Sequence, residues 1–329
     1  MSFAAGTAIE FGLLLPHFSD SASWDRLFGF APRIEELGYG SVWARDNLGF
    51  TGHGFELPGD FFLDPFTTLS GVAARTRTIK LGTAVLTPFR HPLVTAQLVG
   101  GLNFLSGGRF VLGVGPGTPR KPWEALGRPY NERVVACRET VEILRMMSSG
   151  RAESFDGESA SFVDVKLDPA PAADMTVWYG GASNASIRAI GEYADGMMPG
   201  RCPFHRYDVA AEHLRTAADE AGRAVRLGSI PIVSIARKNE TAFDQIPLQA
   251  LLDTATTRWK RPYEDPADLA GALVAGDPAA CIEQIQSFVD RGVELLVVDM
   301  RLSMDEFEQA VELFASEVMP VFADARSTQ

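Results

Sequence analysis

Polar side chains that could do chemistry stand just after the first three predicted strands of this chain. His17, Asp46, His53 and His91 each lie at or shortly beyond the end of an apolar run. Imidazole and carboxylate groups in such places could exchange protons with a ligand or hydrogen-bond to it. The sequence contains no HxH, HExxH or GxSxG pattern, so a metal-dependent or serine hydrolase is disfavoured and no metal site is predicted. His91 directly precedes Pro92, which favours a structural role where a helix begins.

The stretch "RFVLGVGPG" ends in three glycines, Gly113, Gly115 and Gly117, separated by single residues. A dinucleotide-binding turn needs glycines at its first, third and sixth positions, followed at once by a helix. Here the third glycine comes one residue early, and the prolines of "TPRKPWEALGRPYN" delay the helix. We therefore interpret the stretch as a strand that opens into a functional loop, where small residues let a flat ligand approach the backbone. The alternative is a crowded turn without a ligand.

A second glycine pair, Gly180 and Gly181, lies in "WYGGASNASIRAI" between a predicted strand and a predicted helix. Free N–H groups at a helix N-terminus, together with the helix dipole, favour a phosphate group. Ser183 could contact such a phosphate, or it could simply cap the helix. Basic residues after the third and fourth strands indicate an anionic ligand at the same end, with a solvated surface as the alternative. They are Arg90, Arg120, Lys121 and Arg128.

The composition is that of an acidic globular protein. The 329 residues are 46% hydrophobic and 22% charged, and the formal net charge is −12. Because this charge repels phosphates, we expect neither a nucleic-acid partner nor a membrane partner. The three cysteines show no CxxC spacing, so a disulfide framework is not expected and a cytoplasmic location is predicted. The sequence shows neither a signal peptide pattern nor an apolar run long enough to span a bilayer.

Strand-like and helix-like segments alternate along the whole chain. Strands separated by helices require parallel pairing with right-handed crossovers. Eight such units predict an α/β fold, the (β/α)8 TIM barrel, with a doubly wound sheet as the competing arrangement. The eight predicted strands cover residues 8–16, 41–45, 78–86, 109–115, 175–181, 195–200, 226–237 and 294–300.

Two stretches exceed the minimal repeat, as insertions after strands four and seven. Residues 151–174 are predicted to form a hairpin excursion, and residues 241–276 a helical insertion or a lid. No linker or shift in composition divides the chain, so we expect a single domain over residues 1–329.

Several helix boundaries follow from local capping signals. Asp64 is a predicted N-cap, with Pro65 at the first helical position. Another helix is predicted to begin at Pro92 and to end at the glycine pair of "LSGG". Pro32 should kink or divide the first helix.

Four segments together are similar to the bacterial-luciferase-like superfamily of flavin and deazaflavin oxidoreductases. They are "GYGSVWARDN", "IKLGTAVLTPFRHPLVTAQLVGGLNFLSGGRFVLGVGPG", "WYGGASNASIRAIGEYADGMMP" and "DPAACIEQIQSFVDRGVELLVV". The resemblance covers nearly the whole chain, and it implies a TIM barrel that binds coenzyme F420 or FMN at the C-terminal ends of its strands. "GVGPG" and Asp46 resemble the F420-dependent branch more closely. That branch implies hydride transfer between the deazaflavin and a small organic substrate.

The resemblance also implies particular site residues. It places a non-proline cis peptide at Ala84–Val85, where a bulge would back the ring of the cofactor. It places Asp46 and Asn47 at the polar edge of the ring, and the phosphate at the loop that begins at Gly180. The implied cofactor-binding residues are Asp46, Thr83, Ala84, Val85, Gly115, Gly117, Thr118, Gly180, Gly181, Ala182 and Ser183.

The chain departs from the family pattern where F420 enzymes commonly carry Asp-His. It has Asp46 and Asn47 there, and asparagine cannot exchange a proton near neutral pH. The catalytic candidates are therefore Asp46 and Asn47, with His17 or His53 to handle protons. Pro116 stands where bacterial luciferase has an arginine, which disfavours a luciferase-type FMN clamp.

Two alternative functions remain open from the sequence. The first is an FMN-dependent two-component monooxygenase that uses reduced flavin and O2, which would need a flavin reductase as partner. The second is a non-catalytic flavin-binding or structural barrel protein. The sequence leaves the oligomeric state open, with a homodimer as one candidate, since dimers are common in the resembled family and among soluble enzymes.

Overall fold

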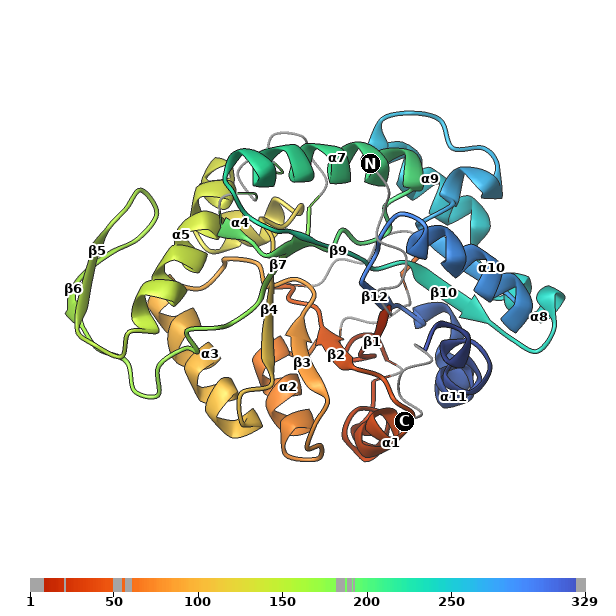
Figure 1. Cartoon of the computed structure of the whole chain (residues 1–329), viewed down its shortest axis with the longest axis horizontal. Coiled ribbons are helices and arrows are strands. Elements are labelled where there is room, and N and C mark those ends of the chain that lie inside the picture. The colour runs from red at the N-terminus through yellow and green to blue at the C-terminus, as the bar shows by residue number, and fades with distance from the viewer. Residues whose placement is uncertain are drawn as a thin grey trace.

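A closed barrel of eight parallel strands forms the centre of the molecule (Figure 1). The computed structural model describes residues 9–20, 22–49, 55–56, 61–181, 187, 191 and 193–323. The strands pair in the order β1–β2–β3–β4–β7–β8–β9–β12 and back to β1, which confirms the predicted (β/α)8 barrel. The barrel strands are β1 (Glu10–Leu14), β2 (Ser41–Ala44), β3 (Lys80–Thr83), β4 (Phe110–Val114), β7 (Val177–Tyr179), β8 (Gly196–Met197), β9 (Arg226–Ser229) and β12 (Leu295–Val298).

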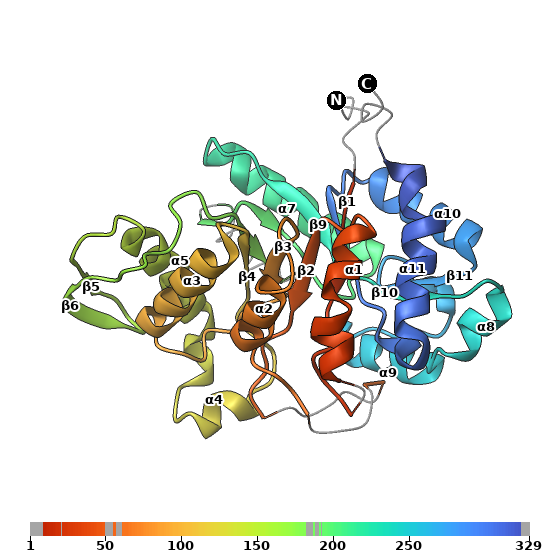
Figure 2. The same ribbon diagram turned by 90° about the horizontal axis from the view of Figure 1, so that it is seen from below.

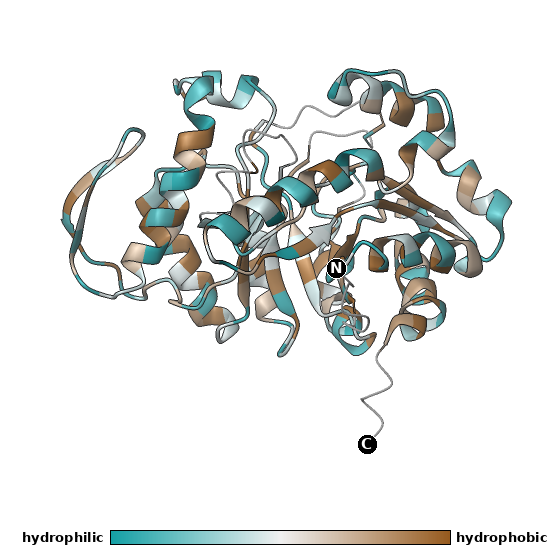
Figure 3. Cartoon of the chain, turned by 45° about the horizontal axis from the view of Figure 1, so that its top comes forward, coloured by the Kyte–Doolittle hydropathy of each residue, from teal (hydrophilic) through white to brown (hydrophobic). Residues whose placement is uncertain are grey.

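Helices form the outer layer around these strands, as two views at right angles show (Figures 1 and 2). Apolar residues concentrate on the strands, whereas the helices carry polar residues as well (Figure 3). The α-helices are α1 (Ala31–Glu36), α2 (Pro65–Ala73), α3 (Pro92–Ser106), α4 (Lys121–Ala125), α5 (Arg133–Met147), α7 (Phe204–Glu220), α8 (Asn239–Asp244), α9 (Leu248–Trp259), α10 (Pro278–Val289) and α11 (Phe307–Glu317). The 3₁₀ and π segments are η1 (Asp25–Gly29), η2 (Tyr130–Glu132), η3 (Pro266–Leu269), η4 (Arg301–Glu306) and η5 (Met319–Phe322).

The interior of the barrel is filled by two indole rings, those of Trp43 and Trp178, with aliphatic side chains around them. Glycines on the neighbouring strands make room for Trp43. A Cβ atom added at Gly82 would lie 2.2 Å from the Trp43 ring, and one added at Gly12 would lie 2.7 Å from its Nε1. The barrel therefore has a packed core, and its binding surface is confined to the strand ends.

The local capping signals correspond to the observed helix boundaries. Asp64 caps α2, its carboxylate accepting from the N–H groups of Phe66 at 2.8 Å and Thr67 at 3.1 Å. His91 caps α3 in the same way, and that helix ends at Gly107 with φ 69°. Pro32 lies where the first helical segment divides into η1 and α1.

The predicted seventh strand, residues 226–237, is in fact two strands. It breaks around Pro231, which has no N–H to donate to a strand ladder. The part before the proline is β9 of the barrel, whereas the part after it, β10 (Ile232–Ile235), pairs in parallel with β11 (Leu273–Gly276). These two strands, with α8 and α9, make an annex beside the barrel (Figure 2). β11 lies within residues 241–276, where no strand was predicted.

Residues 151–174 contain an antiparallel pair, β5 (Glu153–Asp156) and β6 (Ser161–Val165). The pair projects away from the barrel beyond α5 (Figure 1). One carboxylate of α5 holds its turn: Glu139 accepts from the N–H groups of Glu158, Ser159 and Ala160 at 2.6 to 3.1 Å. Among the helices described, none is both long and apolar enough to cross a membrane.

Candidate active site

The predicted cofactor-binding residues that the structure describes come together at the C-terminal ends of β2, β3, β4 and β7. These strands are consecutive neighbours in the barrel. Direct contacts join their ends: the N–H of Ala84 donates to the carbonyl of Ala44 at 2.7 Å, and Leu86 donates to Gly113 at 2.7 Å. We call this region the cofactor half of the barrel face. Ala182, Ser183 and His53 lie outside the described residues.

The peptide between Ala84 and Val85 is cis, which confirms that prediction. Thr83, just before it, is buried and clamps β3 to β4. Its Oγ1 donates to the carbonyl of Gly113 at 2.7 Å and accepts from the N–H of Gly113 at 3.1 Å. The Thr83 side chain therefore holds the ends of β3 and β4 together.

The glycines after β4 and β7 leave space for one side chain, that of Val85. A Cβ atom at Gly115 would lie 2.7 Å from Val85 Cγ2, and one at Gly180 would lie 2.3 Å from Val85 Cγ1. Gly117 has φ 68°, a left-handed conformation that glycine adopts without strain. The glycine spacing thus lets Val85 lie flat against the ends of two strands, and the result is a low apolar wall.

Asp46 forms a largely buried ion pair with Arg90 beside this wall. Arg90 donates to both of its carboxylate oxygens, at 2.7 and 3.1 Å, and the N–H of Thr87 donates to Oδ2 at 3.1 Å. Only 2% of the Asp46 side chain is exposed. Burial raises the pKa of Asp46, and the Arg90 guanidinium opposes that rise. Arg90 also forms an ion pair with Asp64, so Asp46 and Asp64 together fix the arginine at the end of the barrel. Asn47, next in the chain, is half-buried.

His17 is fully buried and bonded to backbone through both ring nitrogens. Nδ1 lies 2.8 Å from the carbonyl oxygen of Leu15, and Nε2 accepts from the N–H of Arg45 at 3.0 Å. Burial lowers its pKa to about 4. The ring is therefore neutral near pH 7 and links the ends of β1 and β2, with neither nitrogen left for a ligand.

This burial predicts a pH-dependent stability. The unfolded chain protonates His17 near pH 6.5 but the folded chain only near pH 4, so its contribution is present above pH 6.5 and is lost as the pH falls towards 4. From pH 7.5 to 4.5 this one group should cost about 2–3 kcal/mol. Urea unfolding at both pH values should show that His17→Gln reduces the pH-dependent loss by this amount. An unchanged pH dependence in the variant would contradict the assignment.

Sequence reasoning missed a group of five buried or half-buried charged residues at the same end of the barrel, which we call the arginine cluster: Arg45, Glu56, Arg201, Asp299 and Arg301. Arg301 donates to Glu56 at 2.5 Å and to Asp299 at 2.5 to 2.9 Å. Arg45 donates to Glu56 at 3.3 and 3.4 Å, and Arg201 lies 3.7 Å from the same carboxylate. The signal was present in the chain, since "VWAR" ends a predicted strand with an arginine, and "MMPGR" and "VVDMR" each place one directly after a predicted strand.

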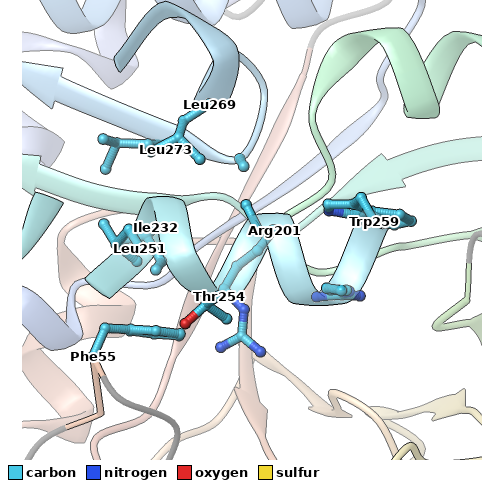
Figure 4. A pocket seen from close by; sticks show the side chains of 11 residues that line it. Phe55, Arg201, Ile232, Leu251, Thr254, Trp259, Leu269 and Leu273 are labelled. Carbon is cyan, nitrogen blue, oxygen red and sulfur yellow. The ribbon is translucent and has the colours of Figure 1, made fainter. Parts of the chain in front are cut away.

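A cavity adjoins the arginine cluster on the side of the annex (Figure 4). Its cavity volume is about 30 Å³, and it is partly open to solvent. Most of its wall comes from α9 and from the segment between η3 and β11, both within residues 241–276. Its lining residues are Phe55, Arg201, Ile232, Leu251, Thr254, Ala255, Arg258, Trp259, Leu269, Ala272 and Leu273. We call this region the annex pocket.

Comparison with known proteins places the chain in a family. The model of the luciferase-like monooxygenase family matches residues 9–295. The chain belongs to this family. Two relatives of this luciferase-like protein are a 5,10-methylenetetrahydromethanopterin reductase from Methanolobus tindarius and an F420-dependent glucose-6-phosphate dehydrogenase from Nakamurella multipartita. The first is 25% identical over 322 residues, covering 88% of this chain and 94% of the relative. The second is 28% identical over 326 residues, covering 89% and 91%.

The luciferase-like fold is also seen in solved structures. An F420-dependent secondary alcohol dehydrogenase, solved with an F420–acetone adduct, matches with a TM-score of 0.79 at 17% identity. The match covers 96% of this chain and all of that one. Within the residues that the structure describes, no three His, Cys, Asp or Glu side chains are grouped so that they could hold a metal ion.

Proposed function

We propose that this luciferase-like protein is an F420-dependent oxidoreductase that transfers a hydride between the deazaflavin and a small organic substrate. The observation that carries the proposal is the F420 dependence of a relative aligned over nine-tenths of both chains. The site supports it, because the cofactor half offers a flat apolar wall beside fixed polar groups. When bound, reduced F420 would supply the hydride, and the protein would supply orientation and a dry pocket.

The described residues fit a flat ring with one polar edge. In this proposal Val85, backed by Gly115 and Gly180, forms the wall on which the ring lies. Asp46 holds Arg90 in place, and Asn47 hydrogen-bonds to the polar edge of the ring. His17 positions the loop after β2 and takes no part in proton transfer, because backbone groups occupy both its nitrogens.

Basic residues in the loop after β4 suit the anionic part of the cofactor. Arg120 and Lys121 begin α4, and Tyr130 donates to the carbonyl of Thr118 at 2.8 Å in the same loop. The Arg120 guanidinium lies over the Tyr130 ring at 4.6 Å, which keeps it near this loop. Arg128 has a different role, since it donates to the carbonyl of Pro88 at 2.6 Å and ties together the loops after β3 and β4.

Residues 241–276 would cover the substrate. The walls of the annex pocket come largely from this segment, which lies against the ends of β8 and β9. The cofactor half, on β2, β3, β4 and β7, and the annex pocket, beside the ends of β8 and β9, therefore share one end of the barrel. A homodimer and a cytoplasmic location stay predictions.

Titration of the purified protein with F420 and, separately, with FMN tests the proposal. We expect the absorption and fluorescence of F420 to change saturably, with an affinity at least about tenfold higher than that for FMN, or about 1.4 kcal/mol. Asn47→Ala should weaken F420 binding, because the polar edge of the ring loses a hydrogen bond.

The opposite preference would overturn the F420 assignment. Tighter binding of FMN would favour the two-component monooxygenase with its separate reductase. The family to which the chain belongs is described as luciferase-like monooxygenases. Failure to bind either cofactor would favour a non-catalytic barrel.

A further inference from the structure

We propose that the annex pocket binds the anionic group of an organic substrate, a carboxylate or a phosphate, through Arg201 and Arg258. The binding of an anion is inferred from the pocket alone. The identification of that anion as the substrate rests on the proposed oxidoreductase function. Three observations support the binding of an anion: an excess of positive charge, the position of the Arg201 side chain in the pocket, and the apolar walls of the pocket.

Among the described residues, positive charge exceeds negative charge where the arginine cluster meets the pocket. Three arginines of the cluster share two carboxylates, and Arg258 adds a fourth cation at the pocket wall. The carboxylate of Asp299 is taken by Arg301, and that of Glu56 is divided among three guanidinium groups. In a chain of net charge −12, this local excess of positive charge would attract an anion.

Arg201 and Arg258 are the two arginines that line the pocket. Among the described residues, neither guanidinium donates a hydrogen bond to protein. Arg201 has only its 3.7 Å contact with Glu56 and the Phe55 ring at 5.1 Å. Arg258 has only the Trp259 ring at 4.8 Å. Guanidinium groups suit carboxylates and phosphates because their paired N–H groups match two oxygens.

The backbone of Arg201 adopts a conformation that few side-chain-bearing residues take. Its φ is 50°, in the left-handed region, and its N–H donates to the carbonyl of Ile230 at 2.8 Å. Figure 4 shows the side chain running through the pocket, between Phe55 and Thr254 on one side and Trp259 on the other. An outlier held in this way at a pocket is a reason to look for function there.

The remaining walls define the rest of the ligand. Ile232, Leu251, Leu269 and Leu273 line the pocket with aliphatic groups. Thr254 contributes no free donor towards a ligand, because its Oγ1 already donates to the carbonyl of Ala250 at 2.7 Å. A substrate with an apolar body and one anionic end therefore matches the pocket better than a neutral, polyhydroxylated one.

Calorimetric titration of the full-length protein, without cofactor, tests this subsite. The probes are benzoate, phenyl phosphate and, as their neutral counterpart, benzyl alcohol. We expect saturable binding of at least one anion, at least about tenfold tighter than that of benzyl alcohol. The preferred anion identifies a carboxylate or a phosphate site. Arg201→Met and Arg258→Met should each weaken it at least about tenfold, because methionine keeps the apolar stem but removes the charge.

Arg237→Met is the matched control, since Arg237 is exposed and pairs with Glu317 away from the pocket. It should bind the anion as the wild type does. Equal affinity for anion and alcohol, absence of anion binding, or wild-type affinity in Arg258→Met would overturn the proposal. Should Arg201→Met fail to fold by circular dichroism, Arg258→Met decides alone. F420 titration of the same samples keeps the two proposals apart, because anion binding without F420 binding would refute only the F420 oxidoreductase.

Discussion

Glu56→Gln should lower the free energy of unfolding by about 3–5 kcal/mol, the effect expected when one partner of a buried ion pair is removed. The Glu56 side chain is 1% exposed and lies against Arg45, Arg201 and Arg301. Although burial alone would raise its pKa, these arginines lower it to about 2. A neutral amide would leave one buried and two half-buried arginines with Asp299 as the one remaining carboxylate in the arginine cluster.

Urea unfolding at pH 7 measures this effect. Glu36→Gln is the matched control, because Glu36 is 66% exposed and pairs with Arg33 at the surface, where the loss should stay below about 0.5 kcal/mol. Since the pKa of Glu56 is depressed in the folded state, its contribution is present above pH 4.5 and should be lost as the pH falls towards 2. A loss no larger than that of the control would show that the arginine cluster does not depend on this carboxylate.

Gly113→Ala should destabilise the protein by about 3 kcal/mol or more, at the upper end of overpacking effects. The added Cβ would lie 1.9 Å from the carbonyl oxygen of Thr83. That oxygen belongs to backbone, and Thr83 is tied to Gly113 by two hydrogen bonds, so the clash cannot be relieved by rotating a side chain. The separation of β3 from β4 that would follow should also weaken cofactor binding at Val85.

Gly101→Ala is the control, and its effect should have the opposite sign. Gly101 lies inside α3, and its added Cβ would have no neighbour within 4 Å. Alanine in a helix interior should therefore stabilise the protein by about 0.5–1 kcal/mol. Thermal unfolding of both variants distinguishes the two. Comparable unfolding temperatures for Gly113→Ala and the wild type would mean that β3 and β4 are less closely packed than the structure shows.

Much of the fold could be predicted from the sequence, because its signals are local. An apolar run shows a buried strand, and the caps Asp64 and His91 satisfy backbone groups within three residues of themselves. The break at Pro231 was the main error. A stretch of twelve residues, 226–237, looked like one strand, although a proline in its middle pointed to two. Its second half pairs with β11, some forty residues further along the chain, and that pairing has no local signal.

The sequence by itself determined the eight-strand alternation, the helix ends and the glycine positions at which the site is built. Tertiary structure alone decided what those glycines accommodate, since Val85 lies against Gly115 and Gly180 only when three strands are aligned. It also decided that His17 is buried and that both of its ring nitrogens meet backbone groups. The arginine cluster is the clearest case: Arg45 and Arg301 are 256 positions apart, and closure of the barrel brings both onto Glu56. Hydrophobic periodicity in the sequence indicates which face of a segment is buried. Ion pairs depend on which segments come into contact in the fold, and no local pattern contains that information.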